Sequence, residues 1–425
     1  MIKKINAKFT SSEFAKNTAI LTLGTAMAQA VPILFYPALT RLFTPSDFGL
    51  LGLVISITAV LSVLSTGRYE GSILLTSSKE EGINIIGLTL IICFSFLITF
   101  FLILLFTASE ISILFKEPRL KNWVLLCPFF SICIVIYNLY NEWCVRNKYF
   151  KKLASNKIIN SSSTTIGKIV MGLSTLAGTG LLWGDLLGRV LSAAQSLFSF
   201  LKKDGYLIKS ISTKEMRILA RRFQGFPKFA LPESLLDVVN SNLPIFFISG
   251  FFFPEEVGLF SIANNVLSIP ASVISLAVMD VFRQRATEEW KRNGNCINIY
   301  RKTVFVLALI IVPLGATLFF IFPFLFALVL GEDFKSAGEY AKILLPNTVI
   351  LFIFQVVSAV FVIANKLKRS FLWQIFSVVL TLISLLLGAL VFKDIIMMLV
   401  FFVTARVIAN LARFYMTFKY AKGIN

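Results

Sequence analysis

Long runs of apolar residues, separated by short polar segments, follow one another along most of this chain. The runs are continuously apolar, and most have about 20 residues or more, the length a helix needs to cross the ~30 Å hydrocarbon core of a membrane. An outer-membrane β-barrel would instead show alternating segments of about ten residues. The pattern therefore predicts an all-α integral membrane protein with many spans.

Twelve such runs are present. The first follows sixteen polar residues; it is too long for a signal-peptide core and has no clear cleavage site, so we expect it to remain as the first span. The runs at 158–178 and 180–200 are rich in Ser, Thr and Gly, and only the short turn AGTG separates them. The predicted spans are residues 17–39, 47–66, 83–106, 122–142, 158–178, 180–200, 229–251, 256–281, 302–329, 341–363, 370–391 and 394–412.

Positive charges are distributed unevenly between the two sets of connecting loops. If the N-terminus is cytoplasmic, 31 of the 41 Lys and Arg residues lie in cytoplasmic segments, seven in outer loops and three within spans. Because cytoplasmic loops of membrane proteins carry the excess of Lys and Arg, both termini are predicted to be cytoplasmic. The longest polar segment, residues 201–228, is too short to form a separate catalytic domain.

Composition changes this picture little. The chain is 57% hydrophobic and 15% charged, against about 25% charged in soluble proteins. The net charge of +19 comes largely from loops that flank spans, so we interpret it as a topology signal and as contacts to anionic membrane lipids, not nucleic acid. Histidine is absent and the five cysteines form no C-x-x-C pair, so neither a metal site, a disulfide framework nor a cofactor is predicted.

The chain carries the same short hinge twice. LFTPSDFGLL at 42–51 and FFFPEEVGLF at 251–260 match at one offset, with Pro45 opposite Pro254 and Gly49 opposite Gly258. In each hinge, Pro is expected to end one helix, an acid to begin the next, and Gly to allow close packing of the turn.

A second echo relates residues 127–149 to 345–367, where an Asn-Lys pair at 147–148 matches one at 365–366. Two six-helix lobes, related by a pseudo-two-fold axis along the membrane normal, are the simplest explanation, and transporters are often built this way. The predicted domains are a lobe at 1–200, a basic cytoplasmic linker at 201–228 and a lobe at 229–425.

Several stretches resemble the polysaccharide-biosynthesis flippases, often called Wzx-type or O-antigen flippases. They are PALTRLFTPSDFG (37–49), GRYEGSILL (67–75), the segment from FPKFALPES to LSIP (226–270) and GEDFKSAGEYAKILLP (331–346). This family belongs to a superfamily that also holds multidrug-and-toxin extruders and the lipid II flippase. Nearly the whole chain takes part in the resemblance.

The resemblance implies a two-lobed bundle of twelve helices with a MATE-like fold in a bacterial cytoplasmic (inner) membrane. By alternating access it would move an undecaprenyl-pyrophosphate-linked oligosaccharide from the inner to the outer face, for O-antigen lipopolysaccharide or a related surface polysaccharide. A polysaccharide polymerase and a chain-length regulator are the implied partners. Arg41, Arg68 and Glu70 match the family motif, and we expect them to anchor helix ends and lock loops.

Three cations lie within predicted spans. An ionisable side chain at membrane depth costs about 2.5–3.5 kcal/mol or more, so it should face a cavity or a partner. A cationic cleft would ease the crossing of an anionic pyrophosphate head, and Arg offers a forked donor to phosphate oxygens. We therefore predict that Lys168, Arg189 and Arg406 line one cavity that binds the head. Alternatively, Arg189 pairs with Asp185 one turn away and braces its helix.

Acidic residues offer a second hypothesis. Glu233 and Asp237 lie one turn apart near the inner end of the seventh span, and Asp185 lies in the sixth. Each could take part in binding a coupling proton or Na⁺. The alternative for Glu233 and Asp237 is a solvated position at the level of the lipid head groups.

Two other classes of membrane protein share this hydropathy. An ion-coupled exporter of drugs or organic cations would have the same halves but an anionic cleft. A membrane-embedded polysaccharide polymerase or ligase would be expected to carry a large outer loop with catalytic Arg or His. Here the outer loops are short and histidine is absent, which favours a transporter over an enzyme.

Overall fold

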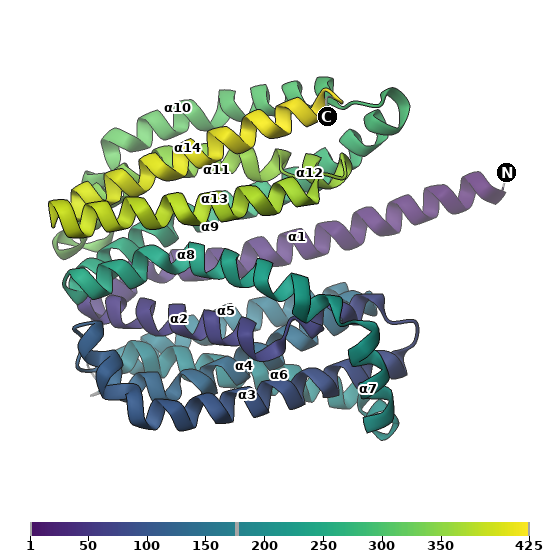
Figure 1. Ribbon diagram of the computed structural model, residues 1–425, viewed down its shortest axis with the longest axis horizontal. Coiled ribbons are helices and arrows are strands. Elements are labelled where there is room, and N and C mark those ends of the chain that lie inside the picture. Colours follow the sequence, from purple (N-terminus) through teal and green to yellow (C-terminus); the bar gives the residue numbers. More distant parts are fainter. Residues whose placement is uncertain (1, 175–177, 424–425) are drawn as a thin grey trace. The chain divides into compact units, whose positions relative to one another are not determined.

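Long helices occupy all twelve predicted spans in the computed structural model, which describes residues 2–174 and 178–423 (Figure 1). About 90% of the chain is helical, and the described residues form no strand. The predicted all-α class is confirmed. Residues 175–177 of the predicted span 158–178, and with them the start of its AGTG turn, lie outside the described residues.

The first seven helices extend through residue 222. They are α1 (Ile2–Leu42), α2 (Pro45–Thr66), α3 (Lys79–Leu114), α4 (Leu120–Arg146), α5 (Phe150–Gly172), α6 (Gly180–Asp204) and α7 (Thr213–Arg222). Short helical turns join some of them: η1 (Tyr69–Leu75), η2 (Gly205–Ser210) and the π-helical η3 (Phe226–Ala230).

The remaining helices are α8 (Leu231–Phe251), α9 (Pro254–Asn293), α10 (Ile297–Leu330), α11 (Lys335–Val357), α12 (Val360–Ile363), α13 (Leu367–Leu386) and α14 (Ile395–Ala421). Two short turns, η4 (Glu332–Phe334) and the π-helical η5 (Leu387–Phe392), lie between them. The predicted tenth span is thus divided between α11 and the single turn α12.

Nine of the described helical segments are long and apolar enough to cross a membrane. Helices α5, α6 and α9 are not among them. A run of Ser and Thr lowers the hydropathy of α5, and charged residues together with Gly, Ser and Gln lower that of α6. The chain is a multi-pass membrane protein in which α5 and α6, two consecutive helices that pack on each other, carry several polar and charged side chains.

The chain divides into two compact units. Unit 1 consists of Met1–Phe43 and Val54–Leu235, and unit 2 of Thr44–Leu53 and Leu236–Asn425. The basic segment 201–228 therefore belongs to unit 1, while residues 44–51 of the first hinge, at the start of α2, belong to unit 2. The predicted division into lobes at 1–200 and 229–425 stays a prediction.

The two hinges differ from their predicted geometry in one respect. Pro45 and Pro254 do not end a helix; each is the first residue of the next one, α2 and α9. This position suits Pro because the first N–H groups of a helix have no intrahelical acceptor. Before α2, the backbone N–H and the hydroxyl of Thr44 both donate to Asp47 Oδ2, at 3.0 and 2.9 Å, which closes the N-terminus as in a capping box.

The two segments of the second sequence match, 127–149 and 345–367, share one backbone conformation where their helices end, but the equivalent positions are shifted by one residue. Lys148 after α4 and Asn365 after α12 both adopt the left-handed conformation, with φ of 58° and 56°. The next N–H donates to the carbonyl five residues earlier in each case, from Tyr149 to Cys144 and from Lys366 to Phe361, as in a Schellman cap. The predicted match of Lys148 to Lys366 is therefore wrong by one position: Lys148 corresponds to Asn365.

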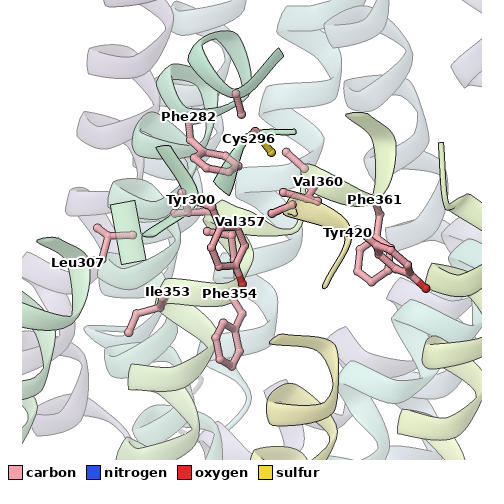
Figure 2. Packing of buried hydrophobic residues seen from close by; sticks show 14 of the residues in the cluster. Phe282, Cys296, Tyr300, Leu307, Ile353, Phe354, Val357, Val360, Phe361 and Tyr420 are labelled. Atoms are coloured by element: carbon pink, nitrogen blue, oxygen red, sulfur yellow. The ribbon is translucent and has the colours of Figure 1, made fainter. Parts of the chain in front are cut away.

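A buried aromatic cluster organises unit 2 at one end of α9, α10, α11, α12 and α14 (Figure 2). At its centre, the Tyr300 hydroxyl lies 2.9 Å from Thr417 Oγ1. Phe354 stacks on Phe414 with 4.8 Å between ring centroids. Because these aromatic rings bury large areas, they hold the last turns of α14 against the bundle.

Segment 201–228 is folded against unit 1. The buried Met216 and Leu219 of α7 form the apolar face of this otherwise basic helix, which packs along α3. The Asn84 side chain donates to Ser210 O (2.9 Å) and accepts from the Ser212 N–H (2.8 Å). This segment therefore forms a wall of unit 1.

Candidate functional site

Close packing of α5 against α6 prepares the first charged site. A Cβ atom added to Gly184 would lie 2.4 Å from Lys168 Cα, and one on Gly188 would lie 2.3 Å from Thr164 Cα. Only glycine leaves room for such an approach, as small residues do at many membrane helix interfaces. The contact places Lys168 of α5 directly beside the helix that carries Asp185.

Asp185 binds two cations at once. Its Oδ1 lies 2.8 Å from Lys168 Nζ, and its Oδ2 lies 2.5 Å from Arg189 Nε. The Asp185 side chain is 2% exposed, whereas those of Lys168 and Arg189 are 17% and 19% exposed. These three residues, the unit 1 triad, combine one buried carboxylate with two partly exposed cations and carry a net charge of +1.

The triad shows what sequence spacing misses. Within α5 no acid lies near Lys168, but α6 supplies one. The predicted pairing of Arg189 with Asp185 at i,i+4 is present, and the same carboxylate serves both cations. The shared carboxylate thus partners two cations, one of which stays uncompensated in charge.

Polar side chains continue from the triad along the α5–α6 interface. Ser192 donates to Asn160 Oδ1 (2.8 Å) and Ser196 to Asn156 Oδ1 (2.9 Å). Lys157 donates to Thr25 Oγ1 of α1, at 3.0 Å. The predicted span 158–178 leaves Lys157 in the preceding loop; this is wrong, because α5 begins at Phe150 and includes Lys157.

Unit 2 holds a second cationic site. Arg406 of α14 donates from Nη1 to Ser377 Oγ of α13 at 3.4 Å, and the Asn240 amide of α8 reaches the same hydroxyl at 3.5 Å. On the same helix, Asn410 donates to Asn347 Oδ1 of α11 at 3.1 Å. The Arg406 guanidinium therefore contacts a polar group and, among the residues that the structure describes, no acid within ion-pair distance.

Arg413 was not among the predicted site residues, because the predicted last span ends at residue 412 and leaves it in the C-terminal tail. Helix α14 in fact continues to Ala421, so Arg413 lies inside it. Its guanidinium stacks on the Trp373 ring, 4.4 Å from the centroid, and its buried Nε has no hydrogen-bond partner in residues 2–174 and 178–423. The signal was present in the spacing of Arg406, Asn410 and Arg413, because residues at i, i+4 and i+7 share one helix face. We call Arg406, Asn410 and Arg413 the α14 ladder.

The two acids predicted to bind a coupling ion lie in the first two turns of α8. Glu233 and Asp237 are both exposed. Asp237 Oδ1 accepts a long hydrogen bond of 3.4 Å from Gln374 of α13. The exposure fits the solvated alternative, and the coupling hypothesis stays a prediction.

The motif residues contact loops and helix ends. Arg68 is in the left-handed conformation, with φ of 59°, and its Nη1 lies 3.1 Å from Glu70 Oε1. Arg41 is exposed in the last turn of α1. In the second hinge, Glu256 accepts a hydrogen bond from the Tyr340 hydroxyl of α11. Across residues 2–174 and 178–423, no three His, Cys, Asp or Glu side chains gather into a group that could hold a metal ion.

Comparison with known families gives one match. The sequence model of a family described as polysaccharide biosynthesis protein matches residues 38–339. No curated protein matches the chain.

Solved structures give broader matches. The lipid II flippase MurJ, in an inward closed conformation, is 13% identical, with 96% of this chain and 90% of that chain covered and a TM-score of 0.68. An inward-facing multidrug resistance MATE family transporter of the MOP superfamily is 16% identical, with 94% and 97% covered and a TM-score of 0.65. A MOP superfamily transporter from Pyrococcus furiosus, described as having a binding pocket of reverse polarity, is 15% identical, with 95% and 94% covered and a TM-score of 0.61. The predicted fold, a MATE-like bundle of twelve helices in two lobes, is confirmed.

Proposed function

This chain belongs to the polysaccharide biosynthesis protein family, and from that premise we propose that it is a flippase for an undecaprenyl-pyrophosphate-linked oligosaccharide. It works by alternating access and has no catalytic step of its own. The oligosaccharide is a repeat unit of O-antigen or a related surface polysaccharide. The membrane is the bacterial cytoplasmic membrane, and both termini are cytoplasmic, as the uneven distribution of Lys and Arg supports.

One observation carries the proposal: in both units, cations at membrane depth outnumber the acids that contact them. The unit 1 triad has a net charge of +1. In unit 2, Arg406 contacts the Ser377 hydroxyl and Arg413 an indole ring, and the part of the chain that the structure describes forms no ion pair with either. Keeping such charges in a membrane is costly, so an anionic substrate is a reason for them.

The residues take distinct roles in this account. In unit 1, Lys168 and Arg189 offer donors to phosphate oxygens while Asp185 holds both side chains in place. In unit 2, Arg406 supplies a forked donor, which suits phosphate better than a point charge does. Trp373 fixes the plane of Arg413 beside it, and its own Nε1 donates to Ala409 O at 2.7 Å. The prediction that Lys168, Arg189 and Arg406 line one cavity stays part of this proposal.

Coupling to a proton or Na⁺ gradient rests on Glu233 and Asp237. Asp185 is the weaker candidate, because both of its oxygens already accept from cations. The polymerase and the chain-length regulator are partners that the family membership suggests, since the flipped repeat unit must be consumed at the outer face.

An ion-coupled drug exporter is the second candidate, because multidrug transporters share the fold. An exporter of organic cations needs acids where its substrate binds. Asp237, the acid whose charge acts on Arg406 and Arg413, favours the flippase instead: it is exposed, and within the described residues its carboxylate makes only a long hydrogen bond to Gln374.

The proposal is tested by deleting the gene from its own host. We expect the cells to lose surface polysaccharide and to accumulate the lipid-linked repeat unit at the cytoplasmic face of the membrane. Restored export from a plasmid copy is the control. Normal surface polysaccharide in the deletion strain, together with new sensitivity to cationic drugs, would favour the exporter.

A further inference from the structure

Unit 1 contains an apolar cavity of about 330 Å³ between α3, α4, α6 and η2. Trp143 and Tyr140 of α4 lie in its wall, with Phe200 of α6 packed edge-on against Trp143 at 5.6 Å. Ile208 and Ile211 close the side formed by the basic segment, which Asn84 holds in place through its two bonds to Ser210 and Ser212. The cavity is therefore a fixed part of the fold.

The cavity opens on the outer surface of the helices. Among its lining residues, Phe94 is 42% exposed, Leu197 is 49% exposed and Leu201 is 47% exposed. Both flanking helices continue with exposed apolar side chains, such as Ile98 on α3 and Leu191 on α6. In a membrane-spanning bundle such a surface faces hydrocarbon, so the medium at the mouth of this cavity is lipid chains.

Cations gather at one end of the cavity. Trp143 Nε1 donates to Asp204 Oδ2 (3.0 Å), and Lys79 Nζ lies 3.2 Å from Asp204 Oδ1. Next to them, Lys203 Nζ lies 3.2 Å from the centroid of the Tyr149 ring, whose hydroxyl accepts from Lys79 at 3.4 Å. Lys79 is thus paired with Asp204, whereas Lys203 contacts a ring and forms no ion pair within the described residues, so these three side chains carry a net charge of +1.

This end lies where α3 begins, α4 ends and α6 ends, which is the predicted cytoplasmic side. Anionic phospholipids give the cytoplasmic leaflet its negative surface potential, and basic pockets between membrane helices on this side bind their head groups. The apolar cavity and the basic rim therefore match the two parts of one molecule. We propose that the cavity holds an acyl chain of an anionic phospholipid, whose phosphate binds Lys203 and Lys79.

Trp143 provides a direct test, because it lines the cavity. The other four tryptophans are replaced by Phe, and the protein is reconstituted into phosphatidylethanolamine vesicles that contain phosphatidylglycerol brominated in its acyl chains. Bromine quenches an indole at contact. We expect quenching of Trp143 at low fractions of brominated phosphatidylglycerol, and several-fold weaker quenching by brominated phosphatidylcholine. Lys203→Glu should remove this difference, whereas Lys214→Glu, a charge-matched change on the separate polar face of α7, should not.

Three outcomes would overturn the proposal. Equal quenching by the two brominated lipids would exclude selection by the basic rim. No quenching by either lipid, in protein with an unchanged gel-filtration profile, would exclude a chain in the cavity. Relief of the quenching by equimolar undecaprenyl phosphate would identify a polyprenyl chain as the occupant in place of the phospholipid. Because no transport is measured, these results are independent of the flippase proposal.

Discussion

Gly49 and Gly258 pack against each other's helix in reciprocal fashion. A Cβ atom on Gly49 would lie 2.0 Å from the carbonyl oxygen of Pro254, and one on Gly258 would lie 1.8 Å from that of Pro45. The start of α2, which lies in the segment Thr44–Leu53, and the start of α9 are both in unit 2. The repeat of the hinge therefore has a physical reason. The glycine of each hinge leaves room for the first helical turn of the other hinge to pack against it.

Substitution of either glycine should destabilise the protein. In Gly49→Ala or Gly258→Ala the new methyl group meets a backbone carbonyl, which cannot rotate away, and overpacking of this kind costs about 1–3 kcal/mol. Thermal unfolding in detergent, followed by gel filtration, should show a lower midpoint for both variants. Gly250→Ala is the matched control, since its added Cβ has no neighbour within 4 Å. Equal midpoints for all three would show that the close approach does not exist.

The unit 1 triad predicts an asymmetry among its members. Asp185→Ala leaves Lys168 and Arg189 without their carboxylate, and removing one partner of a buried pair costs about 3–5 kcal/mol. Lys168→Ala or Arg189→Ala leaves a neutral pair, so the protein should fold but transport poorly. Protein level in membranes and surface polysaccharide are the two measurements.

A double variant separates a brace from a binding site. Asp185→Ala combined with Arg189→Ala keeps Lys168 as a single cation and retains the net charge of +1. If this variant exports at the parental rate, Asp185 and Arg189 only brace α6, and Arg189 does not bind substrate. We expect reduced export, because Lys168 also loses the carboxylate that positions it.

The coupling hypothesis predicts a loss without unfolding. Glu233→Gln and Asp237→Asn preserve shape but remove a negative charge that a proton or Na⁺ would need. Each should abolish the dependence of transport on an imposed ion gradient in vesicles, at unchanged protein yield. If transport by both single variants depends fully on the gradient, neither Glu233 nor Asp237 binds the coupling ion, and both are solvated side chains.

Orientation can be read by cysteine labelling, because the five native cysteines are buried. Burial raises the pKa of the Cys296 thiol to about 11, so this loop thiol stays protonated and unreactive near neutral pH. In intact cells, a membrane-impermeant maleimide should label Lys335→Cys and not Lys209→Cys, both exposed positions. Labelling of Lys209→Cys alone would reverse the predicted topology.

The sequence predicted the helices well because membrane thickness and hydropathy set their lengths. It ended the last span at 412, where polar residues begin, and so missed Arg413. The aromatic cluster around Phe414 and Phe418 extends α14 by about two turns through tertiary packing, which local hydropathy does not record.

The ion pair between Lys168 and Asp185 was also beyond the sequence, since it joins two helices whose relative rotation is set by glycine contacts. The spacing of Gly184 and Gly188 was the available signal, because small residues four apart mark close helix contacts in membranes. The i,i+4 spacing predicted the pairing of Arg189 with Asp185 within α6. The pairing of Lys168 with the same carboxylate could be found only in the structure.

The central claim is that cations in the membrane-spanning helices bind an anionic, lipid-linked head during its crossing. The most direct measurement is translocation of fluorescent undecaprenyl-pyrophosphate-linked oligosaccharide in vesicles that contain the purified protein. A hydrogen bond to a charged group contributes about 1.5–3 kcal/mol, so Arg406→Ala should slow translocation roughly ten- to a hundredfold. Arg406→Lys should recover only part of the rate, because it lacks the planar fork. Arg369→Ala, an exposed site on α13, should match the parent. Parental rates in both Arg406→Ala and Lys168→Ala would contradict the account.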